Sequence, residues 1–411
     1  MHRMVRKVLV AGGGIGGLAA ALACARAGCA VQVFERAGVF AEVGAGLQIG
    51  PNITRVLQAW GLGDALAGLA AFPSHLQVRD AATGRELGVL RLGDRARQRY
   101  GAPYATLHRA DLHQLLLDAV RQQAGSGLLL SCTIHGFAQS DASVAAHTDG
   151  GHQVEGDILL GADGLCSAVR QCLLGDGPPR VTGHLAYRAL VPQHDLPASL
   201  RSQHITVWLG PDLHLVQYPV RGGAWLNVVG IVHQRASAAL GAAQASPASD
   251  ADDGTDAARW DRRTTASRLC AALVGSSAPL QDLVQAVADW RCWTLCDRAP
   301  VSGPGQMAQG RVALLGDAAH PMRPYLAQGA GMAIEDAATL GRMLAAFPAS
   351  AVEAALRAYA DQRWQRNARV QARALRNGRI FHARGPLRWG RDIALRMLGE
   401  RVLDVPWLYR Y

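Results

Sequence analysis

Apolar residues near the start of the chain fall into two short runs on either side of a stretch rich in glycine and alanine. Residues 8–10 and 31–34 are apolar runs of the kind seen in buried strands, and residues 15–27 have the alanine-rich composition of a helix. The order strand, helix, strand predicts the beginning of a parallel βαβ unit.

The middle of the chain has a different pattern. Between residues 186 and 233, short runs such as ITVWLG, LHLVQYPV and AWLNVVGIV are separated by Gly, Pro and Asp, which is typical of an antiparallel sheet. Residues 237–261 are rich in Ala, Ser and Asp and predict a surface loop. After Arg311, the run VALLG predicts another parallel strand, and helical patterns follow it.

These patterns predict an α/β fold in which a Rossmann-like dinucleotide-binding domain is interrupted by an antiparallel β-sheet domain for the substrate, with helices at the C-terminus. The predicted boundaries are 1–70, 100–182 and 296–345 for the first domain, 71–99 and 183–295 for the second, and 346–411 for the helical region.

Composition narrows the class of protein. The 42 Lys and Arg against 32 Asp and Glu give a net charge of +10, which suits an anionic ligand or surface, with solubility as the plainer interpretation. Nucleic acid is less favoured, because the arginines are spread along the chain without a recognition signature. No stretch reaches the roughly 18 uninterrupted apolar residues of a membrane span.

The cysteines and the first residues bear on the compartment. The eight cysteines show no paired metal spacing, so we expect no metal and reduced thiols in a cytoplasmic protein. The opening residues could pass for a signal peptide. The regularly spaced glycines and the strand that follows them favour a dinucleotide-binding start instead.

The first cofactor motif is Gly12-Gly13-Gly14-Ile15-Gly16-Gly17, a GxGxxG between a strand and a helix. Gly12 permits the tight turn, Gly14 lets the backbone approach a pyrophosphate, and Gly17 lets the helix pack against the strand. Glu35 ends the second strand, where its carboxylate would accept hydrogen bonds from a ribose hydroxyl.

Two further motifs each place an acid beside glycine after an apolar strand. They are residues 157–170 (DILLGADGLCSAVR), with Asp163 beside Gly164, and residues 311–321 (RVALLGDAAHP), with Asp317 beside Gly316. Either one alone could be a turn. In combination with the first motif, they predict carboxylates that accept from ribityl or ribose hydroxyls.

With these three motifs in this order, the chain resembles the class A flavoprotein monooxygenases, the para-hydroxybenzoate hydroxylase-like group, along nearly its whole length. Further segments resemble the salicylate hydroxylase and 3-hydroxybenzoate 6-hydroxylase branch: 44–52 (GAGLQIGPN), 108–112 (HRADL), 186–188 (AYR) and 218–223 (YPVRGG).

The resemblance implies one FAD, with NADH or NADPH as a transient co-substrate that has no Rossmann domain of its own. It implies that Arg109 reaches the FAD phosphates, although an exposed arginine is the plainer interpretation. The predicted FAD-binding residues are Gly12, Gly14, Ile15, Gly16, Gly17, Glu35, Arg36, Gln48, Arg109, Asp163, Asp317, Pro324, Gln328, Gly329, Ala330 and Gly331.

The resemblance also implies hydroxylation of a phenolic acid with O2, through a flavin C4a-hydroperoxide. In LHLVQY, alternation places His214 and Tyr218 on one strand face and Gln217 on the other. His214 would remove the phenol proton, for which an ordinary histidine pKa near 6.5 is suited. A strand histidine bonded to a neighbour is the alternative. Tyr218 is the second predicted catalytic residue, and the predicted substrate pocket is Tyr187, Gln217 and Tyr325.

One departure leaves the substrate open: where some members of the branch have Gln before Tyr, this chain has Met322-Arg323-Pro324-Tyr325. The alternatives are hydroxylation of a polyketide or N-heteroaromatic substrate, and a non-enzymatic dinucleotide-sensing protein, which would leave the second and third motifs without a role. A flavin halogenase is disfavoured because no tryptophan forms WxWxIP.

Five arginines, 363, 366, 369, 373 and 376, recur at helical spacing near the C-terminus. A solvated helix face is the favoured interpretation, with a homodimer contact or an anionic-surface contact as the alternative.

Overall fold

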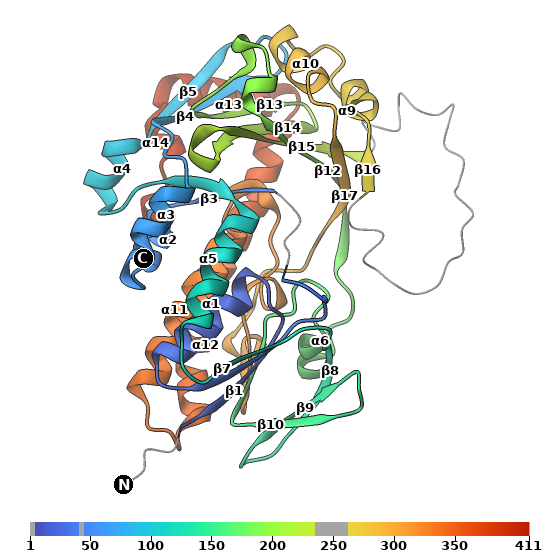
Figure 1. The fold of residues 1–411 in the computed structure, drawn as a ribbon. Helices are drawn as coiled ribbons and strands as arrows, with labels where there is room; N and C mark the ends of the chain where they lie inside the picture. The colour runs from blue at the N-terminus through green and yellow to red at the C-terminus, as the bar shows by residue number, and fades with distance from the viewer. Residues whose placement is uncertain (1–4, 41–44, 235–261, 411) are drawn as a thin grey trace.

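The computed structural model describes residues 5–40, 45–234 and 262–410 (Figure 1). The predicted loop at 237–261 and Gly44 of the segment 44–52 lie outside the described residues.

A six-stranded sheet forms the centre of the dinucleotide-binding part. Its neighbouring strands are parallel except for the edge pair β18–β19. The predicted strand at residues 8–10 lies inside the fully formed central strand, whose apolar residues are buried because the sheet is covered on its faces. In spatial order the strands are β18 (Ala308–Gln309), β19 (Val312–Leu314), β11 (Ile158–Gly161), β1 (Lys7–Ala11), β2 (Ala30–Phe34) and β7 (Ser126–Leu129).

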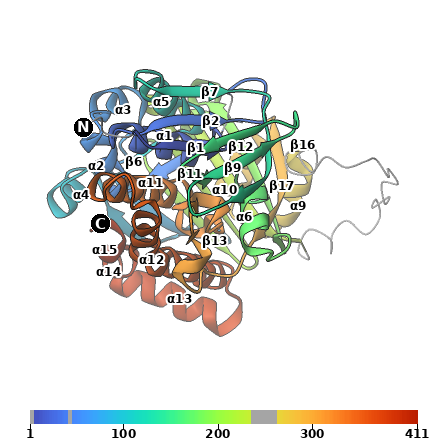
Figure 2. The same cartoon turned by 90° about the horizontal axis from the view of Figure 1, so that it is seen from below.

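Helices cover this sheet through small side chains. The alanine-rich helix α1 (Ile15–Arg26) packs between α5 (Arg109–Arg121) and α11 (Gly329–Ala346), and Figure 2 shows α1 beside α11. Gly341 of α11 lies against Ala23 of α1, where an added Cβ would come within 3.0 Å of the alanine side chain. A three-stranded sheet of β10 (Gln153–Gly156), β9 (Val144–Thr148) and β8 (Ile134–Gln139) contacts β1 and β11.

An eight-stranded sheet forms the second part of the molecule. Its neighbours are antiparallel except for β13 and β4, which pair in parallel. The strand β12 begins before the predicted boundary at residue 183, and β17 ends after the predicted boundary at residue 295. The strand order is β16 (Arg262–Thr264), β17 (Trp290–Asp297), β12 (Arg180–Pro192), β15 (Trp225–His233), β14 (Leu213–Val220), β13 (Ile205–Gly210), β4 (His75–Asp80) and β5 (Glu86–Arg91).

The remaining elements connect and cover the two sheets. A two-stranded antiparallel sheet pairs β3 (Gly46–Ile49) with β6 (Ala105–His108). The other helices are α2 (Pro51–Ala59), α3 (Gly63–Leu69), α4 (Gly93–Tyr100), α6 (Ala168–Leu174), α9 (Ala266–Ala272), α10 (Ala278–Gln285), α12 (Val352–Phe381), α13 (Gly385–Leu398), α14 (Glu400–Leu403) and α15 (Pro406–Tyr409). The 3-10 turn η6 (Pro324–Leu326) lies between β19 and α11.

The two faces of the eight-stranded sheet are named here by their coverings. The outer face packs against α9 and α10 and carries Tyr187, Leu215 and Trp290. The inner face packs against Tyr325 of η6 and Phe381 at the end of α12. His214 pairs with Ile231 of the neighbouring strand, and Ile231 pairs with Ala186 of the next, so these three residues share the inner face. Because side chains alternate along a strand, each residue's face is fixed by this register.

Two further observations bear on the predictions. The predicted architecture, a Rossmann-like domain interrupted by a β-sheet domain and followed by helices, is confirmed. Across the described ranges, no helix is long and apolar enough to cross a membrane.

Candidate active site

A cleft of about 360 Å³ lies at the carboxyl ends of the parallel strands. This is where open α/β sheets bind their ligands. The predicted residues that line it are Gly12, Gly14, Ile15, Gly16, Glu35, Arg36, Arg109, Asp163, Asp317, Gly329 and Ala330. The three sequence motifs therefore come together around one cavity.

The glycine loop has the geometry that its spacing predicts. Gly12 adopts φ +101°, in the region that favours glycine, and a Cβ there would lie 2.5 Å from the carbonyl oxygen of Ala162. An added Cβ on Gly17 would collide with the Gly12 carbonyl, so the helix packs directly on the turn. Gly14 begins α1 without a side-chain cap, which leaves the first N–H groups of the helix for a phosphate in the cleft.

Glu35 and Asp317 both line the cleft but differ in their surroundings. Glu35 accepts hydrogen bonds from the backbone N–H of Gly13 at 2.7 Å and of Ala37 at 2.9 Å, so it also braces the glycine loop. Asp317 is exposed at the cleft. Its predicted role as an acceptor for cofactor hydroxyls fits this position.

Asp163 lines the cleft, and its carboxylate also contacts the start of a helix. Its carboxylate accepts from the Ser167 hydroxyl and from the N–H groups of Ala168 at 2.8 Å and Val169 at 3.2 Å. Burial raises its pKa, against the opposing effect of these hydrogen bonds. The side chain therefore stabilises the start of α6 in addition to lining the cleft.

A buried arginine fixes the loop that carries Asp317. Arg170 donates to the carbonyl oxygens of Ala318 at 3.0 Å and Ala319 at 2.6 Å, and it forms an ion pair with Asp176. Arg170 is 4% exposed. No role was predicted for Arg170, although it ends the second motif.

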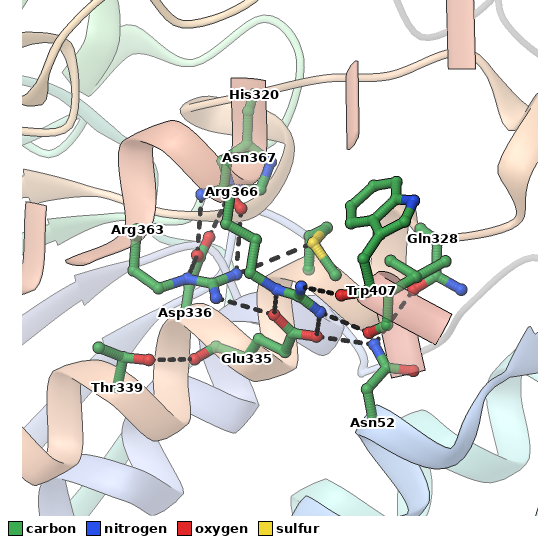
Figure 3. A network of polar contacts seen from close by, with 12 residues as sticks. Asn52, His320, Gln328, Glu335, Asp336, Thr339, Arg363, Arg366, Asn367 and Trp407 are labelled. Carbon is green, nitrogen blue, oxygen red and sulfur yellow. Dashed lines mark hydrogen bonds and ion pairs between the residues drawn. The ribbon is translucent and has the colours of Figure 1, made fainter. Parts of the chain in front are cut away.

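The N-terminus of α11 is held by a buried polar network (Figure 3). Glu335 and Asp336 are fully buried, and Arg363 from α12 pairs with both, at 2.8 and 2.7 Å. Asn52 from α2 donates to Glu335 at 2.7 Å and to Gln328 at 3.3 Å. Gln328 precedes α11, so the network fixes the helix end that lines the cleft with Gly329 and Ala330.

The same network includes His320 of the third motif. His320 bonds to Asp336, and both residues are fully buried. Burial would raise the pKa of Asp336, but His320 and Arg363 hold it well below its ordinary value. The third motif thus ends in a charge-stabilised contact with α11.

The prediction of a solvated arginine face was wrong for Arg363 and Arg366. Arg363 is 1% exposed, and Arg366 pairs with Glu335 at 2.6 Å while donating to the carbonyls of Trp407 and Leu408. The helical spacing was real, but it aligned these arginines with two buried carboxylates on a neighbouring helix. Arg369 stacks over the Trp407 ring at 4.0 Å.

His214 lies on the inner face, where it is 2% exposed. Its Nδ1 is 2.8 Å from Nε2 of His382, and its ring centroid is 5.2 Å from that of Tyr325. Burial, and secondly the nearby His184, lower the pKa of His214 to about 3. The expectation of an ordinary histidine pKa was therefore wrong, because the side chain is withdrawn from water.

Tyr218 lies farther along the same face. An added Cβ on Gly46 would come within 2.5 Å of its ring, which places it against β3. Gln48, also on β3, accepts from the Tyr104 hydroxyl at 2.8 Å. Burial raises the pKa of Tyr218 to well above its ordinary value.

The predicted substrate-pocket residues do not all meet. Tyr325 contacts His214, but Tyr187 is 1% exposed within the outer-face core beneath α9 and α10. Gln217 accepts from the indole N–H of Trp208 at 3.3 Å, in that same core. Alternation along β12 and β14 places these two residues across the sheet from His214.

Other residues at the site carry no sequence signal. Cys132 and Thr133, from the connection between β7 and β8, line the cleft together with Ile134 at the start of β8. His113 bonds to the Gly13 carbonyl at 2.8 Å.

Comparisons with known proteins agree with this arrangement. A family model described as FAD binding domain matches residues 6–374. The chain is 38% identical over 408 residues to a 3-hydroxybenzoate 6-hydroxylase from Polaromonas naphthalenivorans, covering 98% of this chain and 95% of that protein.

Two solved structures share the fold along most of the chain. One is a Klebsiella pneumoniae protein complexed with FAD and uric acid, with a TM-score of 0.80 and 25% identity over 97% of this chain and 94% of that chain. The other is a salicylate hydroxylase substrate complex, with a TM-score of 0.79 and 25% identity. The match covers 99% of this chain and 96% of that chain.

Proposed function

The chain belongs to the FAD binding domain family and is a FAD-dependent monooxygenase of the 3-hydroxybenzoate 6-hydroxylase branch, and from this premise we propose that it hydroxylates a phenolic aromatic acid of the salicylate or hydroxybenzoate type. NADH or NADPH would supply the electrons and O2 the oxygen atom.

The residues of the cleft suit FAD. The uncapped start of α1 and the side chains of Arg36 and Arg109 would hold the phosphates, and Asp317 would accept from the ribityl chain. The N-terminus of α11 would place its N–H groups near the flavin ring, where they favour negative charge. When bound, FAD would take electrons from NAD(P)H and activate O2 for transfer to the substrate ring.

One observation carries the proposal: a single segment joins the cleft to His214. Asp317 lines the cleft, and Tyr325, a few residues farther along, contacts the His214 ring. A flavin held by this segment would therefore lie close to the inner face. His214 lies on that face, and its ring has a nitrogen that can take the proton of a phenol.

The inner face also suits an anionic substrate. Arg188 lies on this face, with its guanidinium 4.6 Å from the centroid of the Trp293 ring. Its charge lowers the pKa of Tyr218 against the larger effect of burial, so Arg188 acts on that part of the face. A carboxylate on the substrate ring would match this positive charge.

The test uses purified, FAD-loaded protein with NADH or NADPH and a panel of aromatic acids. Salicylate and the hydroxybenzoates should stimulate cofactor oxidation and give ring-hydroxylated products detectable by mass spectrometry. Benzoate, which lacks the hydroxyl, should give no such product. A protein that shows bound flavin in its visible spectrum but hydroxylates no phenolic acid would contradict the proposal.

A second candidate is an N-heteroaromatic substrate. It is favoured by the similarity to the structure complexed with uric acid. That structure covers 97% of this chain, and the salicylate hydroxylase complex covers 99%. An acidic ring N–H could give its proton to His214 as a phenol would. The same panel decides between the two if it includes hydroxypyridines and purines.

We propose a cytoplasmic location for this activity. Within the described ranges, no disulfide joins any of the eight cysteines, as is usual for proteins of a reducing compartment.

A further inference from the structure

Four histidines form a chain of ring contacts leading away from His214. His214 bonds to His382, the ring of His382 is 5.3 Å from that of His184, and His184 is 4.9 Å from His233. They come from β14, the end of α12, β12 and β15, so four separate parts of the fold meet here. His214 is buried, whereas the other three are half-buried.

The hydrogen bond between His214 and His382 fixes what His214 can do. A neutral imidazole has one N–H donor and one acceptor nitrogen. If Nδ1 of His214 donates to Nε2 of His382, then Nε2 of His214 is unprotonated and can accept a proton. In the reverse arrangement, Nε2 of His214 carries a hydrogen and cannot act as a base.

His184, the next histidine after His382, has a nitrogen that can accept a hydrogen. Nδ1 of His184 is 3.1 Å from the Thr182 carbonyl oxygen, which can only accept, so this nitrogen carries the hydrogen. In a neutral His184, Nε2 is therefore an acceptor. His184 and His233 are paired residues of neighbouring strands at the side of the sheet near β17.

The position of His382 favours transient positive charge. It is the C-cap of α12, a helix of 30 residues, and its own N–H bonds to the Gly378 carbonyl. The carboxyl end of a helix carries partial negative charge, which favours a protonated histidine there.

Resting on the proposed function, we propose that His382 is the positioning residue for His214 and the first carrier of the substrate proton away from it. The substrate O–H bond breaks as Nε2 of His214 gains the hydrogen, and Nδ1 of His214 passes its own hydrogen to Nε2 of His382. His382 then gives up its Nδ1 hydrogen toward His184, His233 and solvent. No charge stays on His214, and the electrons of the O–H bond remain on the substrate as a phenolate.

The burial and charges around the cluster disfavour a substrate proton that stays on His214 or His382. Burial, followed by His214, His184, His233 and Arg323, lowers the pKa of His382 to about 2. Arg323 is paired with Asp297, and Asp212 with Arg384, so the formal charges around the cluster are largely matched. An imidazolium is therefore unfavourable at both His214 and His382, and transfer through them avoids a lasting charge.

Two substitutions separate the two roles of His382. In His382→Gln, the amide oxygen can still accept from Nδ1 of His214, but the amide cannot relay a proton. In His382→Phe, both functions are lost. His204→Gln is the matched control, because His204 stacks on His75 at 4.4 Å where β13 and β4 begin, apart from the four histidines.

The first measurement is the tautomer of His214 by ¹⁵N NMR of the FAD-loaded protein, which requires no turnover. We expect hydrogen on Nδ1 in the unchanged protein, in His382→Gln and in His204→Gln, and loss of this preference in His382→Phe. Hydrogen on Nε2 of His214 in the unchanged protein would overturn the positioning role.

The second measurement is hydroxylation rate and product formed per NAD(P)H, followed against pH. His382→Gln and His382→Phe should keep their FAD and lose about 10-fold to 100-fold in rate, less than the roughly 100-fold to 10,000-fold of a lost general base. The deficit should shrink at high pH, where the phenol ionises unaided. His382→Gln with unchanged rate and coupling would overturn the relay. If no phenolic substrate is hydroxylated at all, the proposed function fails, while the NMR measurement still decides the role of His382.

Discussion

The two faces of the eight-stranded sheet are made from the same strands but have opposite chemistry. The outer face fills the space beneath α9 and α10 with Tyr187, Leu215 and Trp290, and its buried Gln217 serves the indole of Trp208. The inner face buries His214 against a second imidazole and carries Arg188.

The two faces differ in how favourably their side chains are buried. Burying a polar group is unfavourable unless it is hydrogen-bonded, so a packed core tends toward apolar side chains, as on the outer face. The inner face keeps imidazoles where apolar residues would pack more favourably. We infer that the outer face provides stability and the inner face provides chemistry, and the following substitutions test that division.

The largest effect is expected for His214→Asn on the inner face. Loss of the base should slow ring hydroxylation by roughly 100-fold to 10,000-fold while FAD stays bound. Reduced flavin would still react with O2, so hydrogen peroxide should replace product, and high pH should restore part of the rate. Product yield and peroxide are measured per NAD(P)H oxidised. A near-normal rate with unchanged coupling would return His214 to a packing role.

Tyr187→Ala on the outer face should affect stability instead. Truncation of a fully buried aromatic residue costs about 3–5 kcal/mol of unfolding free energy. Urea unfolding of the FAD-loaded protein measures this loss, and the coupling of the folded fraction should stay unchanged. Uncoupling comparable to that of His214→Asn would place Tyr187 in the substrate site after all.

The inner face should also make the protein sensitive to acid. The folded pKa of His214, about 3, lies below its ordinary value of 6.5, so the unfolded chain binds the proton first as pH falls. Stability is therefore complete above about pH 6.5 and declines as pH falls toward 3. At pH 5 this one group costs about 2 kcal/mol. His214→Asn should lose about that much less than the unchanged protein between pH 7 and pH 5, and an equal loss in both would contradict the folded pKa.

The smallest effect is expected for Gln217→Leu, three residues from His214 but on the outer face. It removes the acceptor of the Trp208 indole N–H and should cost about 1–3 kcal/mol of unfolding free energy, at the lower end if water can replace the amide. Hydroxylation and coupling should not change, and a loss of coupling would break the division between the faces.

The cofactor cleft was largely predictable because its chemistry depends on local backbone geometry. The glycine spacing around Gly12 and Gly17 dictates a turn and a close helix contact, and both are present. The acids were harder to interpret. Asp163 follows a strand as Asp317 does, yet its carboxylate serves the start of α6, a contact that spacing alone does not reveal.

The substrate side was less predictable because its contacts join distant segments. Alternation correctly separated His214 from Gln217, but it gave no indication that His382, far along the chain, would supply the hydrogen-bond partner. Likewise, the helical spacing of Arg363 and Arg366 was visible in the sequence, while the buried Glu335 and Asp336 opposite them could be recognised only from the packing of α11 against α12.

The most direct test of the central claim is to follow the oxygen atom. The FAD-loaded protein is given NAD(P)H, the phenolic acid that best stimulates its oxidation, and ¹⁸O2, and the product is analysed by mass spectrometry. The account predicts a ring-hydroxylated acid that carries one ¹⁸O atom per molecule, with the His214→Asn variant consuming NAD(P)H but forming little of it. Consumption of NAD(P)H with peroxide as the sole product for every acid tested, or a product without ¹⁸O, would contradict it.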